Sequence, residues 1–452
     1  MRTPRRSYEE LCRLFRWQLP ASYNFALDAV DQRVQNGADG HRTALVVEDG
    51  AGVISRHTFL DLALYSNRLA HLLTAKGIGA GATVALLAAP SAAAAIALLG
   101  ILKTGAVAAL FSTDAPPSAD ILAARNVKAV IGDQHSQACV VRMIRDLPGL
   151  HLALTAHAAT GETDEFWTSL IGMTDDFPPP CTGPADPALW LHDGPDGAAA
   201  LYPHSALKAR AVAAAYLYQG FPKLGDVMWS ASDWATGQGW IDAVLPAWYH
   251  GASVVAASPE HDSLPGLLSR QGVRVLHLPD KSMDRLRAVL DGRGPPLRCL
   301  LLTGRAEPGA LSELTQRFGS AVIPACTPLP FGPMLAPAPF LRFDTPAGAW
   351  GRPPPGYSVD VIDSEGRILP ADTVGLLALP ADSPILPLAT PGWDLPIQTG
   401  AWQSLSMRAF RDLDGNFWPE TSRILPPPRS GPSSYRRPEL KAPRPEDRWR
   451  TR

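Results

Sequence analysis

The feature that most constrains this chain is the repeated alternation of short apolar runs with segments of helical periodicity. Residues 58–76 carry apolar side chains at helical spacing and are followed by Gly77 and Gly79, as helix ends commonly are. An apolar run at 84–87, an alanine- and leucine-rich helix, and apolar runs at 105–111 and 128–131 follow in order. Strands that alternate with helices pair in parallel and are covered on both faces. This stretch therefore predicts a largely parallel sheet of the α/β class.

The alternation resumes after a proline-rich loop at 178–187. Apolar runs typical of strands lie at 188–192, 253–256, 273–278 and 297–302, with helical segments between 205 and 323. A chain of 452 residues is too long for one ordinary hydrophobic core. We therefore expect two or three packed units, beginning with two layered α/β subdomains.

The pattern changes near residue 324. Ten prolines fall between 324 and 356, a density that excludes regular helix and interior strand. Two strand-like runs follow at 358–362 and 374–379, joined by a hairpin-type turn at 363–366. The sequence therefore predicts a small β-rich subdomain after the α/β region.

These changes of pattern set the expected boundaries. An N-terminal extension covers 1–19, the α/β subdomains 20–330, the β-rich subdomain 331–423, and a Pro/Arg-rich tail 424–452. Residues 426–452 hold seven prolines and a charge of +5, from eight basic and three acidic residues, which predicts disorder. Two interpretations of this charge stay open, simple solvation and an anionic partner.

Charge and cysteine usage narrow the class of protein. A formal net charge of −2 excludes nucleic-acid binding by bulk electrostatics. The five cysteines are scattered, which is typical of a reducing cytoplasm and not of a disulfide framework or a zinc site. The uncharged run 84–102 is long enough to span a membrane, but Pro90 and Ser91 interrupt it. We expect a cytoplasmic protein without a signal peptide or a membrane span.

Several segments, taken together in their order and spacing, are similar to those of one enzyme family. They are Tyr23–Asp28, Thr58–Leu62, Leu99–Val107, Ser232–Trp240, Leu245–Ala252, Gly351–Asp363 and Phe410–Trp418. The chain in this respect resembles acyl-CoA synthetases of the short- and medium-chain type, in the adenylate-forming, AMP-binding superfamily. The resemblance covers about residues 20–423 and implies the fold of that family's N-terminal domain.

The resemblance also implies a reaction whose requirements can be compared with the residues present. In the family a carboxylate attacks the α-phosphorus of ATP to give an acyl-adenylate and pyrophosphate, and the thiol of CoA then displaces AMP. The cofactors would be ATP, magnesium and CoA. The protein must position the reactants and neutralise phosphate charge.

The segment that corresponds to the family's phosphate loop lacks its usual side chains. Gly194 and Gly197 remain, so a close backbone turn is retained, but the hydroxyl residues are missing. Asp193 and Asp196 place negative charge there, and two like charges about 4 Å apart repel by roughly 1 kcal/mol even in water. The family's lysine position is Ala200. This loop is unfavourable for ATP.

The segment that resembles the adenine and magnesium motif is also altered. Cys326 occupies the position of the family tyrosine that stacks on adenine. Pro330 occupies the position of the glutamate that binds magnesium, and a proline side chain has no oxygen to bind magnesium. The preceding Gly-Glu motif is Thr303-Gly304-Arg305, so a base replaces an acid, with Glu307 nearby.

The segments that resemble the family's ribose-binding and hinge motifs also differ from the family sequences. The family's Thr-Gly-Asp is Thr399-Gly400-Ala401, which loses a charged acceptor whose hydrogen bonds are each worth about 1.5–3 kcal/mol. The hinge segment is replaced by 421–426, with Arg423 near the family arginine. From the short polar tail, we expect the family's mobile C-terminal domain to be absent.

What remains of the resemblance defines candidate site residues. A vestigial ATP/AMP site would comprise Gly194, Gly197, His204, Thr303, Gly304, Thr399 and Gly400. A substrate pocket would comprise Trp234, Gly237 and Trp240, with Trp248 nearby. Ordinary packing roles stay open for His204 and for the tryptophans. No catalytic residue and no metal ligand is assigned.

Losses at several charge-bearing positions beside well-formed scaffold segments favour a pseudoenzyme. Two such roles stay open: a scaffold or regulatory partner of an active synthetase, and a binder of acyl or nucleotide ligands. The alternative is an active carboxylate–CoA ligase, an acid–thiol ligase of fatty acid metabolism, that uses His192, His204, Glu307 and Arg423 or a separate C-terminal subunit. The sequence contains no Gly-x-Ser-x-Gly elbow, no strand followed by GxGxxG and no HExxH.

Overall fold

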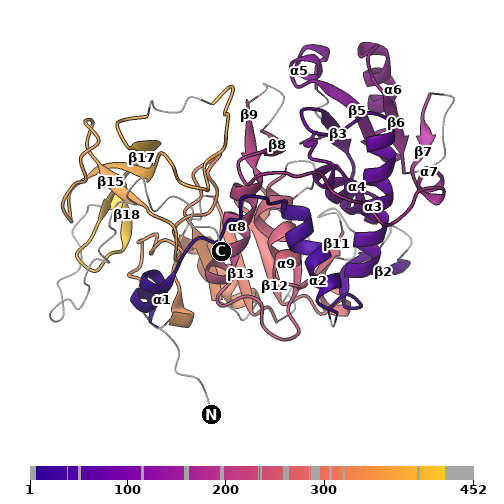
Figure 1. The fold of residues 1–452 in the computed structure, drawn as a ribbon. Coiled ribbons are helices and arrows are strands. Elements are labelled where there is room, and N and C mark those ends of the chain that lie inside the picture. The colour runs from indigo at the N-terminus through magenta and orange to yellow at the C-terminus, as the bar shows by residue number, and fades with distance from the viewer. Residues whose placement is uncertain are drawn as a thin grey trace.

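The computed structural model describes most of the 452 residues. These are 7–37, 39–48, 52–112, 117–156, 162–193, 198–232, 234, 237–257, 264–284, 286, 296–304, 308–318, 321–341, 343–393 and 398–422. Three sheets with their helices make up the fold (Figure 1).

The first seven-stranded sheet is built from the early alternating segments. In spatial order its strands are β7 (Asp164–Glu165), β6 (Leu152–Thr155), β5 (Val127–Gly132), β3 (Thr83–Leu87), β4 (Val107–Leu110), β8 (Pro187–Asp193) and β9 (Ala198–Pro203). Every neighbouring pair is parallel except the hairpin β8–β9. The predicted strands at 84–87, 105–111, 128–131 and 188–192 are confirmed.

The second seven-stranded sheet takes strands from both ends of the α/β region. Its order is β14 (Ala321–Ala325), β13 (Cys299–Thr303), β12 (Val275–Pro279), β10 (Val227–Ser230), β11 (Ser253–Ala256), β1 (Thr43–Glu48) and β2 (Ile54–Thr58). Only β1 and β2 pair antiparallel. Pro324 lies in β14, an edge strand, where a missing N–H is tolerated.

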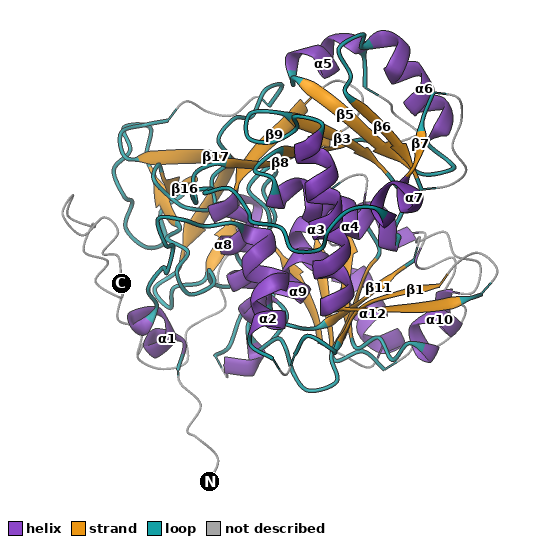
Figure 2. Cartoon of the chain, turned by 45° about the vertical axis from the view of Figure 1, so that its right-hand side comes forward, coloured by secondary structure: helices purple, strands orange, loops and turns teal. Residues whose placement is uncertain are grey.

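Helices fill the space between these two sheets (Figure 2). They are α3 (Phe59–Ala75), α4 (Ala92–Lys103), α8 (His204–Leu217) and α9 (Leu245–Tyr249), while the short helix α2 (Gln32–Gln35) lies beside α3 and buries none of its residues. Thr58 and Asp61 form a capping box that starts α3 as its sequence predicts. Every residue of α4 is buried, so the uncharged run 84–102 forms strand, turn and core helix. Among the described residues, no helix is long and apolar enough to cross a membrane.

The outer faces carry shorter helices. Those associated with the first sheet are α5 (Ala119–Ala124) and α6 (Gln137–Asp146), whereas α7 (Phe166–Ile171) packs against α3 and the main core. Those associated with the second are α10 (Leu264–Arg270) and α12 (Pro308–Phe318). Both faces of the second sheet are packed, one against the main core and one against a second apolar cluster that includes Leu267, Leu302 and Phe318. The predicted parallel, doubly covered architecture is confirmed.

The third sheet is the predicted β-rich unit. Its antiparallel strands are β15 (Asp360–Ile362), β16 (Gly375–Pro380), β17 (Trp402–Arg411) and β18 (Phe417–Pro419). The predicted turn at 363–366 forms. The residue that pairs after it is Ile368, in an isolated β-bridge with Ile362, and β16 begins only later, at Gly375. The N-terminal helix α1 (Tyr8–Leu14) packs nearby, where the Tyr8 hydroxyl donates to the Pro353 carbonyl.

One buried ion pair anchors α4. The Lys103 side chain is fully buried, and its Nζ donates to Asp31 Oδ1 at 2.8 Å and to Asn67 Oδ1 at 2.7 Å. Burial lowers the pKa of Lys103, and Asp31 opposes that shift. An ammonium removed from water is stable only with such partners.

We therefore expect Asp31→Ala to lower the free energy of unfolding by about 3 kcal/mol, because it leaves the Lys103 charge buried without its counterion. Urea unfolding followed by circular dichroism measures this. The control is Arg408→Ala, which breaks an exposed ion pair with Glu420 and should change stability by less than about 1 kcal/mol. Equal effects of the two substitutions would contradict this account.

A buried histidine links three strands of the second sheet. His277 on β12 bonds Ser230 Oγ on β10 at 2.9 Å and Thr303 Oγ1 on β13 at 3.2 Å. Its side chain is fully buried, and burial lowers its pKa from 6.5 to about 3. The folded protein therefore holds this imidazole neutral under mildly acidic conditions.

Below pH 6.5 the unfolded chain binds a proton that folded His277 does not, so stability should fall as pH decreases toward 3. The slope from this one group is at most about 1.4 kcal/mol per pH unit. We expect His277→Gln to remove about 2 kcal/mol of the stability difference between pH 7 and pH 5. Denaturant titrations at both pH values measure it. Replacing the exposed His41 by Gln is the matched control, and a similar loss there would refute the assignment.

Candidate functional site

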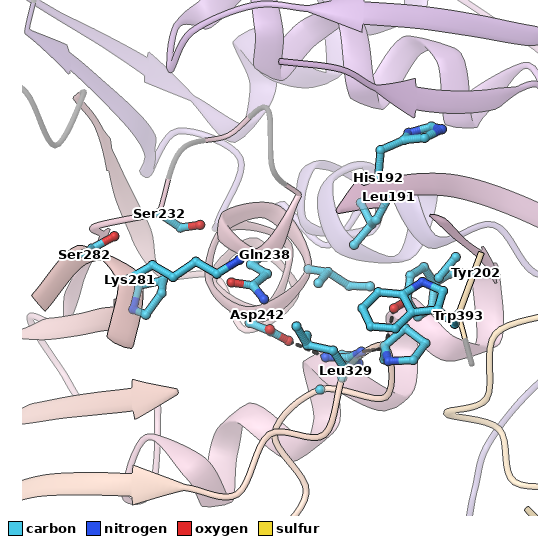
Figure 3. Close-up of a pocket in the computed structure, with 16 residues that line it drawn as sticks. Leu191, His192, Tyr202, Ser232, Gln238, Asp242, Lys281, Ser282, Leu329 and Trp393 are labelled. Atoms are coloured by element: carbon cyan, nitrogen blue, oxygen red, sulfur yellow. Dashed lines mark hydrogen bonds and ion pairs between the residues drawn. The ribbon is translucent and has the colours of Figure 1, made fainter. Parts of the chain in front are cut away.

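A cavity of about 180 Å³ lies where the three sheets approach one another. Its walls come from β8 and β9, from α8, from the segment 232–242, from the end of β12 with the following turn, from the loop 329–332, and from Trp393 (Figure 3). The carboxyl ends of parallel strands and the loops after them are the usual place for ligands in such folds. This cavity is the candidate site.

Two positions that the sequence resemblance relates to the family's phosphate lysine and magnesium carboxylate lie on this one cavity. Ala200 on β9 and Pro330 in the loop after β14 both line it, although 130 residues separate them in sequence. The correspondence of these two positions to the family motifs stays a prediction. Neither side chain carries a charge or a hydrogen-bonding group, so neither of these two positions offers a side-chain ligand for magnesium or for a phosphate.

The Pro330 carbonyl is engaged by the protein itself. The Tyr202 hydroxyl donates to it from β9, and Arg210 Nη2 donates to it at 3.0 Å from α8. Burial raises the pKa of Tyr202 to about 12, so the phenol keeps its proton. With two donors on one oxygen, the loop is held to the α/β layer without any bound ion.

Arg210 and Asp242 form a buried ion pair in the cavity wall. Their side chains are 3% and 4% exposed, and Nη1 lies 2.6 Å from Asp242 Oδ1. Asp242 comes from a π-helix (Trp240–Val244), and its backbone carbonyl accepts a hydrogen bond from the Tyr218 hydroxyl at 2.7 Å. Burial raises the pKa of Asp242, and the guanidinium opposes that rise.

Gly332 is required next to this pair. It has a φ of +78°, and a Cβ there would lie 1.4 Å from Arg210 Nη1. Only glycine admits both the left-handed backbone and the guanidinium. The loop, the arginine and the glycine therefore form one packed unit.

Two histidines proposed as alternative active residues are held neutral. In Figure 3 His192 points away from the other labelled side chains, and its ring stacks on Phe111 with centroids 4.3 Å apart. His204 begins α8, is fully buried, and accepts from the Phe25 N–H at Nδ1. Burial lowers the pKa of each to about 4.

Thr303 and Gly304 lie at the carboxyl end of β13. Thr303 is buried and bound to His277, which gives it a structural partner. Gly304 has a φ of +101°, and a Cβ there would lie 2.3 Å from the Asp280 carboxyl group. Neither residue is among the described residues that line the cavity, although Pro279, Lys281 and Ser282 beside them are.

Thr399 and Gly400 form a turn before β17. The Thr399 N–H donates to the Trp402 carbonyl at 2.9 Å, and Gly400 has a φ of +60° and is exposed. Ala401 is exposed as well. None of these three lines the cavity within the described part of the chain. Their role in a nucleotide site stays a prediction.

The tryptophans predicted for the substrate pocket pack against one another. The ring centroids of Trp234 and Trp240 are 4.1 Å apart, and those of Trp240 and Trp248 are 6.1 Å apart, all in the main core. Gly237 has a φ of +78° and packs against Leu191, so a Cβ there would lie 2.1 Å from Leu191 Cδ2. The residues of this segment that line the cavity are instead Ser232, Gln238, Ile241 and Asp242. The substrate role of Trp234, Gly237 and Trp240 stays a prediction.

Other predicted positions lie outside the described residues. They are Gly194, Gly197, Arg305, Glu307, Arg423 and the tail from 424 onward. Among the described residues, no group of three or more His, Cys, Asp or Glu side chains could hold a metal ion.

Sequence reasoning missed the polar residues of the cavity wall. Tyr202, Arg210, Asp242, Lys281 and Trp393 were not selected, yet all five line the cavity. One signal was present, because Asp242 and Arg210 each interrupt an apolar helical segment, and a buried charge needs a partner. No local sequence feature indicates that Arg210 and Asp242 pair with each other.

Comparison with known proteins agrees with this geometry. The AMP-binding enzyme family matches residues 32–380, more than three quarters of the chain. An acyl-CoA synthetase from Brucella canis superposes with a TM-score of 0.80 at 18% identity, over 91% of this chain and 79% of that one. No curated protein matches the chain.

Two aryl-CoA ligases are similar in fold. The anthranilate CoA ligase AuaEII, solved with anthranoyl-AMP, gives a TM-score of 0.74 at 20% identity over 89% of this chain and 77% of that one. A benzoate CoA ligase from Burkholderia xenovorans LB400 gives 0.72 at 20% identity over 88% and 79%. At these identities the likeness establishes the fold alone. Because the family model matches most of its length, the chain belongs to the AMP-binding enzyme family.

Proposed function

We propose that this family member binds a small ligand in its cavity and does not adenylate it. One observation carries the proposal. The two positions that should supply charge to ATP and magnesium are Ala200 and Pro330, and both stand on the wall of the cavity. The described sheets and helices around them form a cavity, so a binding space is present where these two charges are missing.

The missing charges bear directly on rate. Transfer to or from the α-phosphorus depends on cations placed against the developing phosphate charge. Removing a single preorganised group from such a site commonly reduces kcat by about 10²–10³-fold. Here a cation and a magnesium carboxylate are absent together, and the Pro330 carbonyl is already bound by Tyr202 and Arg210. Among the described residues of the cavity wall, these two positions do not fit magnesium–ATP.

The decisive measurement is carboxylate-dependent ATP–pyrophosphate exchange by the purified protein. Magnesium and a panel of short-chain, medium-chain and aromatic acids are supplied, with the benzoate CoA ligase as the positive control. We expect exchange at background, because the site lacks the charges that stabilise pentavalent phosphorus.

A cavity-filling variant makes the result interpretable. Gln238 is half-buried and lines the cavity, so Gln238→Trp should fill it without disturbing the core. Exchange by the natural chain that disappears in Gln238→Trp would show that the cavity adenylates, and the chain would be an active acid–thiol ligase. Exchange that is equal in both preparations would come from a contaminant.

A further inference from the structure

The candidate cavity is not closed, and one end of it reaches solvent. Among the described residues that line it, Lys281 is exposed, and Gln238 and Ser282 are half-buried. In Figure 3 the Lys281 side chain extends toward Gln238, on the side of the cavity opposite Tyr202 and Trp393. Lys281, Gln238 and Ser282 therefore form one polar end, which we call the mouth of the cavity.

The rest of the described wall is largely apolar. Ala200, Ile241 and Pro330 are buried there, and none of these side chains carries a polar group. The two charges in this part belong to Arg210 and Asp242, which lie 2.6 Å apart and compensate each other. This part of the cavity therefore suits the apolar body of a ligand.

The mouth combines a cation with the N-terminus of a helix. Lys281 lies in a short 3₁₀ turn, Asp280–Ser282, that directly follows β12. Gln238 is the first residue of a continuous helical segment, 238–249, which includes the π-helix and α9. The first N–H groups of a helix give its N-terminus a partial positive charge of about half an elementary charge, which favours an anion. Two positive features from separate elements therefore face the same space.

The acid next to Lys281 is directed away from this space. Asp280 is half-buried and is not among the described residues that line the cavity. Its Oδ1 accepts a hydrogen bond from the Lys281 N–H at 2.7 Å, and a Cβ on Gly304 would lie 2.3 Å from its carboxyl group. The Asp280 carboxylate therefore packs against the end of β13 and does not enter the cavity.

We infer that the mouth recognises an anion, and that the cavity takes an amphipathic acid whose anionic group pairs with Lys281 while its apolar body lies along the remaining wall. A carboxylate held at the mouth lies on the side opposite β9, which carries Ala200. The inference rests on the cavity taking a ligand, as proposed above, and it accounts for an acid that binds without presenting its carboxylate for adenylation. Because the cavity is open, a ligand longer than one ring can extend into solvent.

Four single-ring probes test the inference by calorimetry on the full chain at neutral pH. They are benzoate, benzenesulfonate, benzamide and benzylammonium. We expect the two anions to bind with similar affinity, each about 5- to 20-fold more tightly than neutral benzamide, and benzylammonium to bind most weakly. Benzenesulfonate forms no acyl-adenylate, so its binding reports recognition of charge alone. The preference for anions should decrease with added salt, because mobile ions screen an exposed lysine.

One substitution assigns the preference to the mouth. Lys281→Gln removes the charge, and it should abolish most of the preference for benzoate over benzamide while leaving benzamide binding unchanged. Lys281 is exposed, so the substitution should not disturb folding. The matched control is Lys76→Gln, which changes the net charge equally at an exposed lysine that follows α3 and does not line the cavity. This control should retain the full preference.

The outcomes are separable. Equal binding of benzoate and benzamide, or tighter binding of benzylammonium, would overturn the inference and leave a ligand-binding cavity in place. Binding of no probe up to its solubility would overturn it as well. A preference that survives Lys281→Gln, or that Lys76→Gln reduces equally, would overturn the role of the mouth. Pyrophosphate exchange with benzoate is measured independently, so exchange with an intact preference for anions would refute the proposed loss of catalysis and not the recognition of an anion.

Discussion

The arrangement of the cavity depends on one buried cation. A guanidinium removed from water must find acceptors, and Arg210 finds them on two elements far apart in sequence, the π-helix that carries Asp242 and the loop that carries Pro330. The same side chain lies over the Tyr202 ring, with its Cζ 5.6 Å from the centroid. Gly332 leaves the space that the guanidinium occupies. Helix, strand, π-helix and loop are therefore positioned by a single set of contacts.

This interaction also bears on the chemistry. In an adenylating member the loop around position 330 would present a carboxylate toward magnesium. Here the loop is held inward by hydrogen bonds to its own backbone, and the opposite wall carries Ala200 where a lysine is expected. Charge has not disappeared from the cavity, because Arg210, Asp242 and Lys281 all line it. Arg210 and Asp242 neutralise each other at 2.6 Å, and Lys281 adds a cation to the wall.

Much of the fold was predictable because it is determined locally. The helical spacing of 58–76 and its Thr58–Asp61 capping box specify α3, and the alternation of apolar runs specifies parallel sheets. The bridge between Ile362 and Ile368 after the 363–366 turn was not predictable. The register of strand pairing depends on tertiary contacts, which the sequence of a turn does not specify. The cavity wall was missed for a related reason. Arg210 lies in an alanine-rich helix where arginine commonly faces solvent, and only packing against Gly332 and Pro330 makes it internal.

The core explains why such changes at the site are tolerated. Trp234, Trp240 and Trp248 pack with α4 and α8 in one apolar cluster between the sheets, and Lys103 is satisfied within it by Asp31 and Asn67. Ala200 belongs to the same cluster, so an apolar side chain at this position is part of the core packing. Active-site charges are generally held at a cost to stability, so replacing them with small or cyclic apolar residues does not weaken the scaffold. The core therefore does not require charged side chains at positions 200 and 330, which agrees with the proposal that the cavity binds a ligand without adenylating it.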